Sequence, residues 1–278
     1  MILFGITPGS FGQLGIFEKQ IKQCSENIAT IKVKFLRPYC IAYLHQILIN
    51  ELFENPEKRL HSTYPIANQY LKQCGFDFLP ENVICENNFP QEHIIKLYLL
   101  NAGSINEDEK ITNWIELNIL RFLPKLNPAL KKKIVKNLWE IISNSLLHSE
   151  SKSGVSICGQ FYPQKGYFEL AFCDNGLGIA NVVKSHDYIK KSDEDYKCII
   201  WATQEGTSTK PQNISGGLGL YILKEFIKLN KGALQIISGN GYFGNTEGIN
   251  PVPNRLKNYI SGTIVNLRII FDQNLYSI

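Results

Sequence analysis

The sequence predicts an α/β protein in two parts, and two patterns lead to this fold class. In residues 1–90, short stretches with strand-like alternation take turns with stretches whose apolar residues have helical spacing. In residues 112–278, a long amphipathic helix precedes two strands, a further helix and two more strands. We therefore expect a small α/β domain at 1–90, a connection at 91–111 and a second α/β domain at 112–278.

The first part shows both periodicities clearly. Residues 31–35 alternate apolar and polar side chains, which indicates a strand with one buried face. In residues 39–52, Ile41, Leu44 and Leu48 recur at helical spacing. The full set of expected elements is a strand at 1–7, helix 16–24, strand 31–35, helix 39–52, strand 59–62 and helix 65–73, which Gly75 ends.

The second part begins with a helix from Thr112, which Pro124 and Pro128 end before the central helix around 136–149. A turn at 163–166 separates the next two segments, which read as an antiparallel pair of strands. The later elements are strands 155–161 and 167–173, helix 218–229, strand 233–237, a loop at 238–261 and strand 262–270.

Composition limits the class of protein. A hydrophobic content of 44% with 19% charged residues is that of a globular protein with a sizeable core. The net charge of +4 is too mild to indicate a nucleic-acid partner. The seven cysteines are scattered, which favours reduced thiols over a disulfide frame or a zinc site. No signal peptide or membrane-spanning run is evident, so we expect a cytoplasmic protein.

The central helix carries a polar stripe. Glu140, Asn144 and His148 are four residues apart, so they stack along one edge of the apolar face. A carboxylate, an amide and an imidazole beside apolar residues are typical of a pocket wall. The alternative is the ordinary polar edge of an amphipathic helix.

A second motif follows the strand at 167–173. Asp174 is followed by Gly176 and Gly178, so the backbone here can approach a flat ligand closely. An ionised carboxylate accepts hydrogen bonds, which suits an exocyclic amine such as that of adenine. The alternative is an Asx-type turn whose glycines serve positive φ angles.

A third motif ends a long polar segment at 181–215. A glycine-rich run opens the helix at 218–229, and backbone N–H groups at a helix N-terminus attract anions. Thr207 and Lys210 would add a hydroxyl and a positive charge for a phosphate group. In the alternative interpretation they are plain loop residues. The run itself consists of Gly216, Gly217, Leu218 and Gly219.

Together the three motifs resemble the Bergerat nucleotide-binding fold of the GHKL ATPases, over roughly residues 112–271. That family includes sensor histidine kinases, anti-sigma serine kinases, gyrase B, Hsp90 and MutL. The resemblance implies a two-layer α/β sandwich, a mixed sheet with helices on one face, and an ATP lid at 180–215. No P-loop, HExxH or GxSxG motif competes with this interpretation.

The resemblance also implies roles for single residues. Glu140 matches the general base, Asn144 the magnesium ligand and His148, less closely, a residue near the phosphates. Asp174 matches the adenine-reading carboxylate with Gly176 and Gly178 beneath the base, and Thr263 lies near adenine. The glycine run receives the phosphates. Ser215 departs from the family, in which many kinases have a glycine at that position.

Residues 35–76 faintly resemble the STAS domain of bacterial anti-anti-sigma factors, although Arg37-Pro38-Tyr39 replaces the usual phosphorylatable loop. We expect an ATP-binding regulator with Mg-dependent ATPase or protein (serine) kinase activity. The alternative is a non-catalytic module that senses ATP or ADP and docks a partner. A protein partner, acting as regulator or phosphorylation substrate, is expected, with no nucleic acid or membrane, and a homodimer stays open. A DNA-linked ATP clamp is disfavoured.

Overall fold

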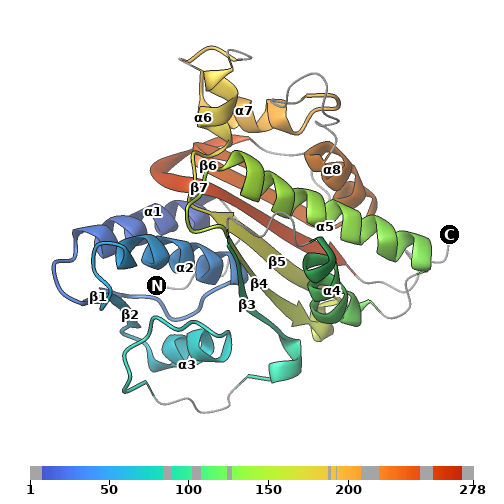
Figure 1. Cartoon of the computed structure of the whole chain (residues 1–278). Helices are drawn as coiled ribbons and strands as arrows, with labels where there is room; N and C mark the ends of the chain where they lie inside the picture. The colour runs from blue at the N-terminus through green and yellow to red at the C-terminus, as the bar shows by residue number, and fades with distance from the viewer. Residues whose placement is uncertain are drawn as a thin grey trace.

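A five-stranded antiparallel sheet forms the centre of the molecule (Figure 1). The computed structural model describes residues 8–83, 89–101, 108–123, 127–186, 189–191, 193–207, 219–244 and 253–270. Every neighbouring pair of strands in the sheet is antiparallel. Their order across the sheet is β3 (Ile94–Leu100), β4 (Val155–Tyr162), β5 (Tyr167–Asp174), β7 (Asn254–Ile270) and β6 (Ala233–Gly244).

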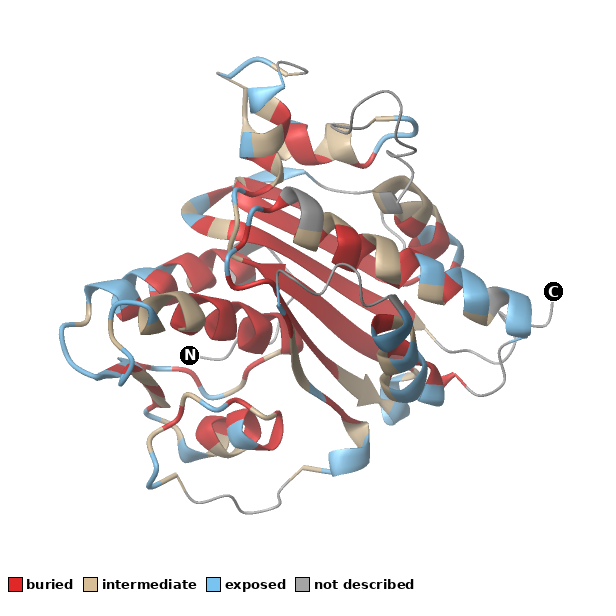
Figure 2. Cartoon of the chain, in the orientation of Figure 1, coloured by how far each residue is buried: buried red, intermediate tan, exposed pale blue. Residues whose placement is uncertain are grey.

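Helices cover both faces of the sheet, because side chains along the central strand β5 alternate between two cores. Phe168, Leu170 and Phe172 pack with α4 (Asp108–Asn118), α5 (Pro128–His148) and α8 (Gly219–Leu229). Ala171 and Cys173 pack with α1 (Pro8–Gln23) and α2 (Pro38–Leu52). All of β5 is buried, which Figure 2 shows as red strands beneath the helices. The N-terminal helices therefore share a core with the sheet.

The N-terminal part also contains a two-stranded parallel sheet, formed by β1 (Ile28–Ile31) and β2 (Arg59–Ser62). Helix α2 connects the two strands in the sequence. Next comes α3 (Pro65–Gln73), which begins at a proline as helices often do. Gly75 follows with a φ of 82°, and the Phe76 N–H closes the helix end on the Leu71 carbonyl. The predictions of β2, α3 and the glycine cap are confirmed.

Several sequence predictions need correction. The sheet is antiparallel rather than mixed. Helices α5 and α8 lie on one face of it, and the N-terminal helices α1 and α2 cover the other. The segment 91–111, expected as a connection, supplies the edge strand β3. The second strand lies at β1, slightly before the predicted 31–35, and the predicted strand at 1–7 lies outside the described residues. Short 3₁₀ turns occur at Gln91–His93, Leu120–Phe122 and Pro163–Lys165.

The predicted loop at 238–261 is mostly strand, because β6 continues to Gly244 and β7 begins at Asn254. Two glycines of this segment, Gly239 and Gly241, allow a helix to pack closely on the strand. A Cβ added to Gly241 would lie 2.6 Å from the backbone nitrogen of Tyr196, in α7 (Asp195–Ala202). Tertiary contact thus overrides the local preference of glycine against strands.

The expected lid segment 180–215 contains two helices, α6 (Ile179–Ser185) and α7. Asp195 fastens them to β6. Its carboxylate pairs with the Lys184 ammonium group at 2.7 Å and accepts the Asn240 N–H at 2.8 Å. Up to Ala202, this segment is therefore joined to the sheet edge by side-chain contacts.

A buried carboxylate links the N-terminal part to the sheet. Glu169 of β5 is fully buried and pairs with Arg268 of β7 at 3.0 Å, and with Arg37, the residue before α2. Burial alone would lower the pKa of Arg37, but the Glu169 charge outweighs this and raises it. Both guanidinium groups thus share one carboxylate as an ion-pair partner.

We predict that Glu169→Gln lowers the free energy of unfolding by about 3–5 kcal/mol, since the buried Arg268 and the half-buried Arg37 would each lose this ion pair. Urea denaturation measures this loss. The control is Glu194→Gln, which breaks the exposed pair with Arg255 at 3.2 Å and should cost at most about 1 kcal/mol. Equal losses in the two variants would contradict the assigned role of Glu169.

Candidate functional site

Asp174 lies where three separated segments meet. It ends β5, where it pairs in register with Val155 of β4 and Thr263 of β7, and only 1% of it is exposed. The Ser145 hydroxyl on α5 hydrogen-bonds to its carboxyl group. The Gly176 N–H donates to its Oδ1 at 3.1 Å. A helix, a strand end and the neighbouring strand therefore surround one carboxyl group.

Burial dominates the chemistry of this carboxyl group, whose hydrogen-bond partners within the described part of the chain are all uncharged. Desolvation raises the pKa of Asp174 to about 7, although hydrogen bonds from Gly176, Ser145 and Thr263 partly offset it. The group is therefore close to half ionised at neutral pH. A ligand that donates a hydrogen bond here would favour the charged form, whereas desolvation favours the protonated one.

The glycines after Asp174 are needed for packing. A Cβ on Gly176 would overlap the carbonyl oxygen of Ser149, to which the Leu177 N–H donates at 2.6 Å. Gly178 has a φ of 79° and is the N-cap residue of α6. The predicted alternative, an Asx turn, is present in the Gly176–Asp174 hydrogen bond. Both glycines belong to the turn between β5 and α6, which packs against Ser149, the residue after α5. Their contact with a ligand stays a prediction.

The polar stripe of α5 lies beside this junction. Pro128 starts the helix, and its buried residues include Ile134, Leu138 and Ile141. Glu140 and Asn144 are half-buried, and neither makes a hydrogen bond or ion pair with another described residue. Asn144 immediately precedes Ser145, the residue that contacts Asp174.

Two residues of α5 were missed by the sequence analysis. Ser145 lies among the apolar side chains of the helix, and it is buried against Asp174. Asn137 is buried, and its Nδ2 has no hydrogen-bond partner among the residues that the structure describes. It lies two turns before Asn144, so the helical period that placed Glu140 and Asn144 together also indicated Asn137.

The structure describes the expected phosphate side only in part. The Thr207 hydroxyl donates to the backbone carbonyls of Trp201 and Gln204, at 2.7 and 3.0 Å. It is therefore engaged within its own loop and is not brought to Asp174. Gly219 is the first residue of α8, and His148 the last residue of α5. Lys210, Gly216, Gly217, Leu218 and the His148 side chain lie outside the described residues.

Among the described residues, no group of three or more His, Cys, Asp or Glu side chains is placed to hold a metal ion. A magnesium ion that accompanies a nucleotide needs no such group, because phosphate oxygens and water supply most of its ligands. The amide oxygen of Asn144 is of the type that completes this shell, and the half-burial of this residue leaves part of it open.

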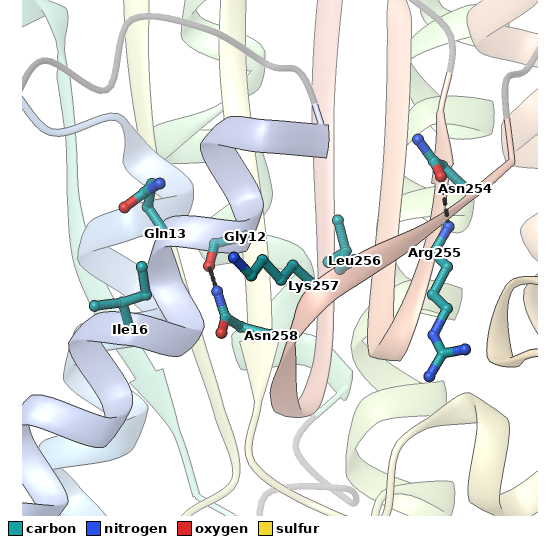
Figure 3. Close-up of a pocket in the computed structure, with 8 residues that line it drawn as sticks. All are labelled: Gly12, Gln13, Ile16, Asn254, Arg255, Leu256, Lys257 and Asn258. Carbon is teal, nitrogen blue, oxygen red and sulfur yellow. Dashed lines mark hydrogen bonds between the residues drawn. The ribbon is translucent and has the colours of Figure 1, made fainter.

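A groove of about 500 Å³ lies elsewhere, between α1 and the first half of β7 (Figure 3). The Asn258 amide donates to the Gly12 carbonyl across it at 2.9 Å. None of the predicted site residues lines this groove. Its lining residues are Gly12, Gln13, Ile16 and 254–258.

The chain matches no protein-family model and no curated protein sequence. None of the described helices combines the length and apolar character needed to cross a membrane.

We predict that the stability difference between the wild type and Asp174→Asn depends on pH. The folded pKa of about 7 exceeds the ordinary value of 3.8, so the native state holds a proton that the unfolded chain releases. The resulting stabilisation is complete below about pH 4 and is lost as the pH rises through 7. Between pH 5 and 8 the wild type should lose about 2–3 kcal/mol relative to the variant.

Denaturant titrations of both proteins at the two pH values measure this change. Asp174→Asn serves as the reference because the amide cannot titrate, so pH effects common to both proteins cancel. A stability difference that stays constant with pH would show that the carboxyl group keeps an ordinary pKa.

Proposed function

We propose that this chain binds ATP in a GHKL-type (Bergerat) site whose adenine end is Asp174 and whose phosphate end lies along α5 and the start of α8. The observation that carries the proposal is the junction at Asp174. The carboxyl group, Thr263 and the end of α5 come from distant parts of the sequence, and they meet there. This is the arrangement that the resemblance requires.

The chemistry of the junction supports adenine as the ligand. The Asp174 carboxylate accepts hydrogen bonds only, and it is buried among uncharged partners, so the exocyclic amine of adenine matches it. Thr263 is nearly buried beside Asp174, on the next strand. Its hydroxyl would supply a further polar contact to the base.

The polar stripe on α5 supports phosphoryl transfer. Asn144 would hold magnesium through its amide oxygen, and the ion when bound would neutralise charge on the phosphates. Glu140, one helical turn away, would accept the proton of the attacking water or hydroxyl group. The γ-phosphoryl group would pass to that oxygen, and ADP would leave.

The expected acceptor is water or the hydroxyl group of a protein partner, which gives an ATPase or a protein (serine) kinase. The N-terminal unit β1–α2–β2–α3 fits the proposed STAS-like part, because a strand–helix–strand unit with parallel strands is present. His45 is poorly placed to accept a phosphoryl group, since its ring is buried and hydrogen-bonded to Ser156. We place the protein in the cytoplasm as a regulator.

A second candidate is a module that senses ATP or ADP without turnover. The engagement of Thr207 within its own loop favours it, because one expected phosphate donor is then unavailable. In this case nucleotide binding would move the 180–215 segment and change the affinity for a partner.

We predict that ATP with magnesium stabilises the wild type against heat, by about 2.7 kcal/mol at a ligand concentration 100 times Kd. Asp174→Asn should lose this gain while its unliganded fold stays as stable as the wild type at pH 8. A thermal-shift series with ATP, ADP and magnesium measures both. Equal stabilisation of the two proteins would contradict the adenine assignment.

We predict that Glu140→Gln lowers phosphate release or phosphoryl transfer at least about 100-fold and leaves ATP affinity nearly unchanged. Calorimetry and a phosphate-release assay separate the two quantities. Turnover that survives the substitution would refute the catalytic role of Glu140. Tight ATP binding by the wild type without phosphate release or label transfer would establish the sensing module instead.

A further inference from the structure

A polar bridge joins α2 to the loop at 149–154, which follows α5. Gln46 uses both ends of its amide group: Nε2 donates to the Ser156 hydroxyl at 2.8 Å, and Oε1 accepts from Ser153 at 2.6 Å. The Nδ1 of the neighbouring His45 lies 2.7 Å from the same Ser156 oxygen. Gln46 and Ser156 are fully buried, so water does not compete for these bonds.

The bridge continues toward the candidate site through buried serines. The Ser153 and Ser151 hydroxyls lie 3.1 Å apart, and the Ser151 N–H donates to the Ser149 hydroxyl at 3.1 Å. The Ser149 carbonyl then accepts the Leu177 N–H at 2.6 Å. A run of close polar contacts, buried as far as Ser149, therefore leads from Gln46 to the turn after Asp174.

The bridge is uncharged at neutral pH. Burial lowers the pKa of His45 to about 4, and the ring stacks on Phe78 with centroids 5.1 Å apart. The remaining members are hydroxyl, amide and backbone groups, which form directional hydrogen bonds and carry no net charge. Such contacts fix the position of a loop closely, because each hydrogen bond weakens when its geometry departs from linear.

We propose that Gln46 is a positioning residue of the nucleotide site. By holding Ser153 it fixes the 149–154 loop, and through Ser149 it sets the turn that carries Asp174 and Gly176. This inference rests on the proposed function. It makes nucleotide affinity depend on α2 and, by thermodynamic reciprocity, makes the N-terminal part respond to nucleotide binding.

Gln46→Leu tests the inference, with Asn68→Leu as the matched control. Asn68 is also a buried amide of the N-terminal part that uses both of its ends, accepting from the Ser62 N–H and donating to the Ser62 carbonyl, each at 2.8 Å. It lies outside the bridge. Loss of either amide should lower overall stability, whereas only Gln46 connects to the site.

Calorimetry with Mg-ATP should show affinity about tenfold weaker for Gln46→Leu and within about twofold of the wild type for Asn68→Leu. Hydrogen exchange should rise at 149–154 and 175–178 in Gln46→Leu alone. Unchanged affinity in Gln46→Leu, or an equal loss in Asn68→Leu, would overturn the proposal.

If the wild type binds no nucleotide, the proposed function fails, and the exchange pattern still decides whether Gln46 positions the turn. Faster exchange at 175–178 in Gln46→Leu alone would support positioning, and unchanged exchange would refute it. Should Gln46→Leu fail to fold, the milder Ser153→Ala removes one bond of the bridge. It should then give the same pattern at a smaller amplitude, and exchange at 175–178 equal to that of the wild type would overturn the proposal.

Discussion

The direct contact between the turn after β5 and Ser149, the residue that follows α5, is the constraint on which the candidate site depends. Gly176 permits it, because a side chain there would collide with the Ser149 carbonyl oxygen. This contact brings the helix that carries Glu140 and Asn144 against the strand end that carries Asp174. The close approach of these two backbone segments buries the Asp174 carboxyl group. This burial raises its pKa, and its hydrogen-bond partners among the described residues carry no charge. The same backbone contact therefore sets both the packing here and the raised pKa of Asp174. Ionisation of this carboxyl group lowers the stability of the folded protein.

The N-terminal part supports the same junction from the opposite side of the sheet. Its helices fill one core with residues of β5, and Arg37 shares the buried Glu169 with Arg268. Gln46 adds the polar bridge to the loop after α5. A regulatory domain held by a flexible linker would act on the site only when it docks, whereas these contacts are part of the folded core.

The sequence predicted what local pattern controls. Pro65 and Gly75 bounded α3, and the spacing of Asp174, Gly176 and Gly178 identified the turn. It did not predict what tertiary contact controls. From sequence alone, the stretch from Gly239 to Gly241 is predicted as a loop, because its packing against α7 is a tertiary contact. A glutamate such as Glu169 is expected at the surface, and its burial depends on arginines that are distant in sequence. The role of Ser145 could not be predicted for the same reason. A serine among apolar residues of a helix does not indicate which distant carboxyl group it will contact.

The central claim is that one cleft takes both the adenine and the magnesium triphosphate. A crystal structure of the chain with a non-hydrolysable ATP analogue and magnesium tests it most directly. The account predicts the adenine amine within hydrogen-bond distance of Asp174, with the metal on Asn144 and the γ-phosphate facing Glu140. A nucleotide seated elsewhere, such as in the groove between α1 and β7, with Asp174 still enclosed by protein alone, would contradict it.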